Sequence, residues 1–148
     1  MKVLEVMNKE VVSISKDASV EEATKLMIEK SVGGLPVVDG ENKVVGMITE
    51  KDLLTRHKEF VPPPYVDILG AFVYLEDPTR ANERLKKSLS SSIEDVMSTP
   101  VFSVNPEDDV QLVLGFMVEQ GFNRIPVEEE EKLVGIVSRG DILKGLAK

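Results

Sequence analysis

Two short segments of the chain place a hydroxyl three residues before a carboxylate, directly after an apolar stretch. The first, GMITEKD, pairs Thr49 with Asp52, and the second, GIVSRGD, pairs Ser138 with Asp141. If each pair opens a helix, this spacing puts both side chains on one face, beside free amides that favour an anion. A carboxylate in that place can accept hydrogen bonds from vicinal hydroxyls, as an Asp does for a ribose. The two segments are therefore candidate sites for a sugar phosphate.

The same spacing has a second interpretation, which involves helix capping alone. A Ser or Thr followed three residues later by an acid is typical of an N-cap with a favourable first-turn charge. For a single copy, capping is the simpler interpretation. The recurrence in two places favours a binding role, although a duplication would also preserve caps.

The sequence carries no pattern typical of catalysis or metal binding. His57 is the only histidine, and no partner that would make it a general base is predictable. We find no metal-ligand spacing, no nucleophile elbow and no phosphate-cradling glycine-rich loop. Cysteine is absent, which excludes disulfides and thiolate metal sites. We therefore expect no catalytic residue, no metal and no resident cofactor.

The elements that must position the two pairs recur along the chain. Val6–Met7 recurs as Val96–Met97, and Asp52 recurs as Asp141. Two copies are too few for a solenoid. The pattern instead predicts a pseudo-twofold pair whose two apolar faces are buried against each other.

The first copy alternates apolar and polar stretches in a way that predicts a β-α-β-β-α order. Ser19 and Glu22 are spaced as a capping box, which marks a helix start, and Gly33-Gly34 is expected to end that helix. Two continuous apolar runs joined by a polar turn predict a hairpin covered on both faces. The predicted elements are a strand at Val11–Ile14, a helix to about Lys30, strands at Leu35–Val38 and Val44–Ile48, and a helix from about Glu50.

The second copy predicts the same order. Its predicted elements are a strand at Val101–Val104, a helix at Val110–Gln120, strands at Ile125–Val127 and Leu133–Val137, and a helix at Gly140–Leu146.

Residues 58–92 separate the copies and have no counterpart. Pro62–Pro64 blocks helix and sheet alike. The apolar run Ile68–Leu75 is either a short helix or a strand, Arg80–Leu89 has the composition of a mixed-charge helix, and Ser88–Ser92 is a flexible lead-in. A connection of this length is either a linker that packs on the module, the simpler interpretation, or a functional segment. The chain thus divides into a first motif at 1–57, an insert at 58–92 and a second motif at 93–148.

Bulk composition limits the class of protein. With 148 residues, 42% hydrophobic and 30% charged, the chain can bury a core without staples. Its net charge of −8 argues against general binding to nucleic-acid backbones, which needs a basic face. No apolar run approaches the roughly 18 residues of a membrane span, and the polar start is no signal peptide. The absence of cysteine is compatible with a reducing cytoplasm, where we place the protein.

Taken in order, these elements resemble a known motif. Val-Met, a strand, an amphipathic helix, a Leu/Ile-Pro-Val strand and Gly-hydrophobic-hydrophobic-Ser/Thr-x-x-Asp together resemble the CBS motif, named after cystathionine β-synthase. The resemblance covers residues 3–55 and 93–147. It implies an α/β (α+β) fold, a tandem pair of β-α-β-β-α motifs with pseudo-twofold symmetry, also called a Bateman module. It further implies two clefts that bind AMP, ADP, ATP, S-adenosylmethionine or a related adenosyl ligand, and commonly a homodimer.

The resemblance also implies roles for residues. Asp52 and Asp141 would hold ribose hydroxyls, and Thr49 and Ser138 would contact ribose or phosphate. The wall opposite would be formed in one cleft by Val32, Gly33 and Gly34, and in the other by Phe122, Asn123 and Arg124. Backbone near Val12 and Phe102 would bond the adenine edge, and Ser98 stands where the family often has a hydroxyl, whereas its counterpart Asn8 departs from that pattern.

Arg124 makes the two copies unequal. The resemblance implies that it grips phosphate, which suits the planar fork of an arginine. The alternative is a surface ion pair with the acidic run Glu128–Glu131, which is itself typical of a solvated turn. From the family's cross-copy arrangement we expect Asp52 to serve the cleft that holds Arg124, and Asp141 to serve the other cleft.

Three functions remain for comparison. The first is a sensor of adenosyl ligands whose conformational change is read by an effector protein or a second copy, since we see no effector domain on this chain. The second is a structural or dimerisation module with empty clefts. The third, an enzyme with an unfamiliar site, has least support because no activated nucleophile is visible.

Overall fold

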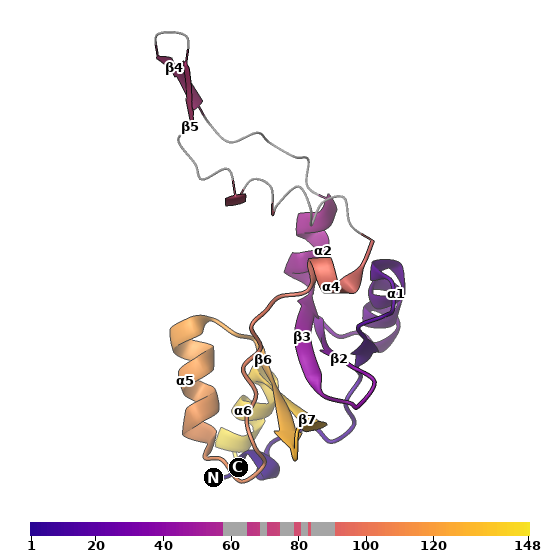
Figure 1. The fold of residues 1–148 in the computed structure, drawn as a ribbon. Helices are drawn as coiled ribbons and strands as arrows, with labels where there is room; N and C mark the ends of the chain where they lie inside the picture. Colours follow the sequence, from indigo (N-terminus) through magenta and orange to yellow (C-terminus); the bar gives the residue numbers. More distant parts are fainter. Residues whose placement is uncertain (58–64, 69–70, 75–78, 81–82, 84–90) are drawn as a thin grey trace.

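The structure, a computed structural model, describes residues 1–57, 65–68, 71–74, 79–80, 83 and 91–148. Two lobes lie side by side, and each holds a β-hairpin packed against helices (Figure 1). The first lobe is built on β2 (Gly34–Val38) and β3 (Val44–Thr49), and the second on β6 (Arg124–Glu129) and β7 (Lys132–Ser138). The predicted mixed α+β repeat is confirmed.

The first helix, α1 (Val20–Lys30), begins where its capping box predicts. The Glu22 amide donates to Ser19 Oγ, and the Ser19 amide donates to the Glu22 carboxylate, both at 3.1 Å. The predicted end near Lys30 is confirmed, but the expectation that Gly33-Gly34 ends the helix is wrong. Ser31, not a glycine, takes the left-handed conformation at the C-cap (φ 54°), because the glycine pair is already part of the approach to β2.

The hairpin of the first lobe has the predicted strands in an antiparallel register, with Leu35 opposite Ile48. Every residue of β2 is buried, whereas β3 alternates between buried and half-buried positions. Only β2 is therefore covered along its whole length as predicted. The predicted strand Val11–Ile14 is reduced to β1 (Ile14–Ser15), which pairs in parallel with β2. The lobe ends in α2 (Glu50–His57).

The second lobe repeats this architecture with two differences. Its helices are α5 (Val110–Gln120), with the predicted bounds, and α6 (Arg139–Leu146). The predicted strand Val101–Val104 is reduced to a single bridge from Val104 to β6. The acidic run forms the tight turn of the hairpin, with Glu130 and Glu131 at positive φ of 51° and 63°.

The leading segment of each motif packs in the lobe formed by the other motif. Val3 of η1 (Val3–Glu5) is fully buried in the core of the second lobe, with Val113 and Val137. The short helix α4 (Ile93–Val96) is buried in the core of the first lobe. In Figure 1 the indigo N-terminal segment accordingly lies beside α6. The two motifs therefore exchange their leading segments.

Two methionine–glycine contacts follow from this exchange. A side chain at Gly46 would collide with Met97, and one at Gly135 would lie 2.8 Å from the Met7 sulfur. Each methionine leads one motif, and each glycine lies in the hairpin of the other motif. The Val-Gly step of each hairpin thus has a packing reason, which is close approach of the opposite motif.

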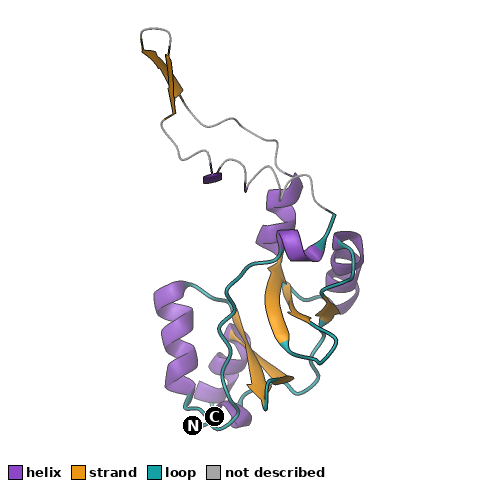
Figure 2. Cartoon of the chain, in the orientation of Figure 1, coloured by secondary structure: helices purple, strands orange, loops and turns teal. Residues whose placement is uncertain are grey.

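The described part of the insert holds a third antiparallel strand pair. Strand β4 (Tyr65–Ile68) pairs antiparallel with β5 (Ala71–Tyr74) as a sheet of its own (Figure 2). The apolar run Ile68–Leu75, predicted as either a short helix or a strand, therefore forms strand structure where it is described. Pro62–Pro64 and most of the predicted helix Arg80–Leu89 lie outside the described residues, except for helical positions at 79–80 and 83. Residues 91 and 92 are bound to the start of α1, where the Val20 amide donates to the carbonyl of Ser91 (3.0 Å).

Candidate functional site

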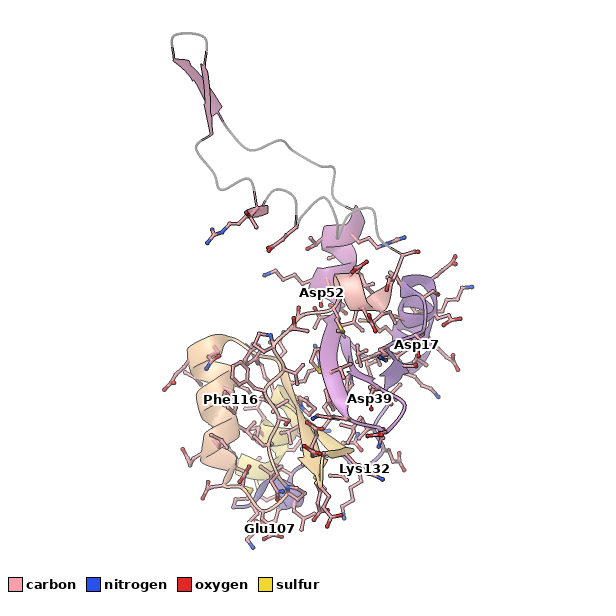
Figure 3. The ribbon with its side chains drawn as sticks, viewed as in Figure 1. Asp17, Asp39, Asp52, Glu107, Phe116 and Lys132 are labelled. Carbon is pink, nitrogen blue, oxygen red and sulfur yellow. The ribbon has the colours of Figure 1, made fainter. Side chains whose placement is uncertain are left out.

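The first hydroxyl–carboxylate pair lies at the corner where β3 passes into α2, next to α4 (Figure 3). Asp52 is buried, with 6% of its surface exposed. Its Oδ2 accepts hydrogen bonds from the Thr49 amide (2.9 Å) and the Thr49 hydroxyl (3.0 Å). Its Oδ1 accepts one from the Ser98 hydroxyl (2.8 Å). Three donors from two motifs thus hold one buried carboxylate.

Ser98 reaches this corner because the leading segments are exchanged. Its amide donates to the Met47 carbonyl (2.7 Å), and its carbonyl accepts from the Met47 amide (3.1 Å). These two bonds form an antiparallel bridge from the second motif to β3. The backbone bridge places the Ser98 hydroxyl over Asp52.

The second pair, at the corner of β7 and α6, has the same cap with fewer bonds. Asp141 Oδ2 accepts from the Ser138 amide and the Ser138 hydroxyl, each at 2.8 Å. Asn8, the counterpart of Ser98, makes the equivalent backbone bridge to Ile136. Its side-chain oxygen, however, accepts from the Glu10 amide (2.9 Å). Among the described residues, none donates to Asp141 Oδ1.

A cleft of about 390 Å³ opens above the first corner, a size within the range of ligand sites. Both motifs line it. From the first motif come Gly33, Met47, Thr49, Glu50 and Lys51, and from the second come Ser98, Gln120, Gly121, Phe122, Asn123 and Arg124.

Arg124 lies across the glycine pair at the start of β2. An added Cβ would lie 2.8 Å from Arg124 Nη2 at Gly33, and 2.6 Å from Nη1 at Gly34. The guanidinium fills the space that side chains would take at these two positions. Burial lowers the pKa of Arg124 below its ordinary value, and the negative charge of Glu50 partly opposes this shift. An arginine nevertheless stays charged at neutral pH.

The acidic run is not the partner of Arg124. The Glu128 carboxylate accepts from the Val44 amide (3.3 Å), and Glu131 forms an ion pair with Lys43 (3.6 Å). These contacts join the tips of the two hairpins, at the end opposite Arg124. Within the described ranges, Arg124 forms no direct ion pair.

The structure brings some of the predicted site residues together in one cleft and leaves others outside it. Thr49, Ser98, Phe122, Asn123 and Arg124 line one cleft, whereas the buried Asp52 does not line it and is bonded to Thr49 and Ser98.

The glycine pair was expected in one cleft and Arg124 in the other, but the structure brings them together. Gly33 lines the cleft that holds Arg124, and Gly34 contacts the Arg124 side chain. The reason is that β2 and β6 begin close together, so the arginine of one motif extends over the glycines of the other. Val32 lines a separate hollow between α1 and α2.

Phe102 takes part in an aromatic cluster instead of a strand. Its ring centroid lies 5.2 Å from that of Phe116 and 5.6 Å from that of Phe122. Phe116 belongs to α5 (Figure 3), so the cluster supports the Phe122 wall of the cleft from behind. Val12 packs against the core of the first lobe.

Sequence reasoning missed two charged residues in the cleft, Glu50 and Lys51. Both lie between Thr49 and Asp52, the hydroxyl and the carboxylate of the first predicted pair. Their position on the first turn of α2 was the available signal. His57 ends α2 and does not line this cleft.

Two features are absent from the described ranges, a helix that could span a membrane and a group of metal-ligating side chains. No helix there is both long and apolar enough to cross a bilayer. No three acidic, histidine or cysteine side chains there are grouped as they would be around a metal ion.

Comparisons with known proteins give the chain its family. The family model for the CBS domain matches residues 3–59 and 93–148. Protein MJ1225 of Methanocaldococcus jannaschii is 30% identical over 142 residues, which cover 96% of this chain and 41% of that protein. Protein MJ1426 of the same organism is 28% identical, covering 99% of this chain and 91% of that protein. Inosine-5′-monophosphate dehydrogenase of that organism is 31% identical over 95% of this chain, which spans only 22% of the enzyme.

Solved structures share the fold. CBSX2 in complex with AMP matches with a TM-score of 0.74 at 23% identity, covering 99% of this chain and 96% of that one. The CBS domain pair of protein MJ0100, in complex with 5′-methylthioadenosine and S-adenosyl-L-methionine, matches with a TM-score of 0.71 at 24% identity, covering 100% and 98%. Because the family model matches both repeats, the chain belongs to the CBS domain family, as a tandem pair of CBS motifs.

Proposed function

We propose that this CBS pair is a cytoplasmic regulatory module that binds an adenosyl ligand, either an adenine nucleotide or S-adenosylmethionine. It relays the resulting conformational change to a partner and catalyses nothing itself. One observation carries this proposal: a cleft lined by both motifs, in which Thr49, Ser98 and Arg124 converge above the buried Asp52.

The groups in the cleft suit the parts of such a ligand. A carboxylate offers about four acceptor positions, and Asp52 uses three of them within the chain. The remaining position can accept a ribose hydroxyl. Arg124 presents a planar fork that suits phosphate, and the Phe122 wall offers apolar surface to a base.

A ligand in this cleft would contact both motifs at once. Its binding would favour one arrangement of the lobes over another, by no more than its difference in affinity for the two arrangements. Proteins with this fold have been solved with AMP and with S-adenosyl-L-methionine, which supports the choice of ligand class.

One observation favours the alternative of a structural module with empty clefts. Asp52 is already held by Thr49 and Ser98, so the corner is complete without a ligand. A titration separates the two functions. We expect AMP, ATP or S-adenosylmethionine at 100 times its Kd to stabilise the protein by about 2.7 kcal/mol, measured as a shift in Tm. If none of the three shifts Tm or gives heat in calorimetry, the structural function is correct.

The role of Arg124 has a matched control on the same hairpin. We expect Arg124→Gln to weaken AMP binding about tenfold or more, because a charge-assisted bond to phosphate is lost. Lys132, exposed at the far end of the hairpin (Figure 3), loses the same charge in Lys132→Gln. Calorimetry should show no change for this control. Equal losses in both variants would mean that only net charge matters.

The ribose assignment is tested with the two acids. Asp52→Ala is expected to weaken binding in the cleft that holds Arg124, and Asp141→Ala in the other cleft. Unchanged affinity in both variants contradicts the assignment.

We also propose that the module forms a homodimer. Both helix pairs carry exposed apolar side chains: Ile28 (74% exposed) and Leu54 (72%) on α1 and α2, and Val118 (80%) and Leu143 (67%) on α5 and α6. Exposed apolar patches commonly mark protein contacts. Light scattering should give twice the chain mass, and Val118→Glu together with Leu143→Glu should reduce it. A wild-type monomer at high concentration contradicts the proposal.

A further inference from the structure

Three charged side chains line the cleft, two of them positive and one negative. Arg124 and Lys51 are positive and Glu50 is negative. The buried Asp52 does not line the cleft and is joined to it through Thr49 and Ser98. Arg124 is half-buried, whereas Glu50 and Lys51 are exposed at the rim. Among the described residues that line the cleft, Glu50 is therefore the single acid, facing the two cations Arg124 and Lys51.

Glu50 and Arg124 face the same point of the cleft. An added Cβ at Gly33 would lie 2.8 Å from Arg124 Nη2 and 3.4 Å from Glu50 Oε1. The two groups make no direct ion pair within the described part of the chain, so a ligand atom can approach both. The electrostatic effect of Glu50 raises the pKa of Arg124 against the lowering caused by burial, which indicates that the two charges interact.

The carboxylate of Glu50 is not needed to build the corner. The Glu50 amide donates to the Gly33 carbonyl (3.1 Å), and in the second motif the Arg139 amide donates to the Asn123 carbonyl (3.1 Å). The equivalent backbone position thus carries the opposite charge in an equivalent corner. The side chain at this position is free to serve another role.

We propose that Glu50 sets the charge selectivity of this cleft, favouring adenosyl ligands with one phosphate or none over di- and triphosphates. This inference rests on the proposed function. The first phosphate of a ligand would be held by Arg124. Each further phosphate would meet Glu50 at short range, in a chain that already carries a net charge of −8. Lys51, on a flexible stem, offsets Glu50, which leaves Arg124 as the single surplus cation among the described residues of the lining.

The test compares ligands that differ only in phosphate number. Binding of adenosine, AMP and ATP to the full chain is measured by calorimetry for wild type, Glu50→Gln and Glu21→Gln. Glu21 is the matched control, since it is an exposed acid in the first turn of α1, as Glu50 is in the first turn of α2. Removal of a like charge near 6 Å at an intermediate dielectric changes affinity on the order of tenfold.

We expect Glu50→Gln to strengthen ATP binding about tenfold and AMP binding a few-fold, and to leave adenosine unchanged. Glu21→Gln should leave the ratio of ATP to AMP affinity as in wild type. If Glu50→Gln leaves that ratio unchanged, or alters all three affinities by one factor, the selectivity role is overturned while the proposed function stands. If neither wild type nor variant binds any adenosyl ligand, the proposed function fails and this inference fails with it.

Discussion

The two strand-to-helix corners have the same backbone but different hydrogen bonding. In the first lobe, Asp52 is buried and accepts three hydrogen bonds, one of them from the opposite motif. In the second lobe, Asp141 is half-buried and accepts two, both from Ser138. The difference comes from one position in the leading segments, where Ser98 donates to the acid and Asn8 turns back to Glu10. A duplicated fold therefore preserves the cap, while a single residue decides whether that cap also joins the two motifs.

The largest expected effect distinguishes the acids themselves. Asp52→Ala should lower the free energy of unfolding by about 3 kcal/mol, because it leaves the Thr49 and Ser98 donors without their acceptor. Asp141→Ala should cost about 1 kcal/mol, the usual loss for a helix cap. Urea denaturation measures both. Equal losses would mean that the bond from Ser98 contributes nothing to stability.

The glycines that face the exchanged methionines give the next effect. Gly46→Ala and Gly135→Ala should each cost about 2 kcal/mol by overpacking, since an added Cβ meets Met97 or Met7. Gly135 also faces the Asn8 carbonyl oxygen at 3.2 Å, which is backbone and cannot yield as a methionine can.

Double-mutant cycles separate these two glycines. Met97→Ala should relieve most of the cost of Gly46→Ala, whereas Met7→Ala should relieve only part of the cost of Gly135→Ala. The same coupling energy in both cycles would contradict the described difference.

A smaller effect is expected at the residue that causes the asymmetry. Ser98→Ala should cost about 1.5 kcal/mol, the typical value of a hydrogen bond to a charged group. Asn8→Ala, the control at the equivalent position, should cost less, because Asn8 donates nothing to Asp141. Thermal unfolding measures the loss of stability in both variants. A larger loss for Asn8→Ala than for Ser98→Ala would contradict the idea that only Ser98 strengthens its corner.

The smallest effect would remove the asymmetry. Asn8→Ser places a hydroxyl where the backbone bridge to Ile136 should aim it at Asp141. We expect stability to rise by no more than about 1 kcal/mol, and only if Asp141 is present. A gain that persists in the Asp141→Ala background would show that the new hydroxyl bonds elsewhere.

Local sequence signals predicted the four longer helices α1, α2, α5 and α6, but not the short helices η1 and α4. The capping box at Ser19 and the apolar run after Asp109 set the starts of α1 and α5, because a helix satisfies its own backbone. The short strands were harder, since only Ile14 of Val11–Ile14 and only Val104 of Val101–Val104 pair with another strand. A strand exists only where a partner is available, and the partner is set by the tertiary fold. The roles assigned to the site residues stay predictions until ligands are tested.

By itself, the sequence determined the repeat, the order of the main elements, the helix N-caps and the family, because these depend on spacing along one chain. Only the tertiary structure decided that the leading segments are exchanged, that Ser98 bonds to Asp52, and that Arg124 lies over Gly33 and Gly34 opposite Glu50. These contacts join residues distant in sequence, and their energies depend on burial and orientation. No local pattern encodes which distant residues meet, so only the folded structure shows which groups the cleft brings together.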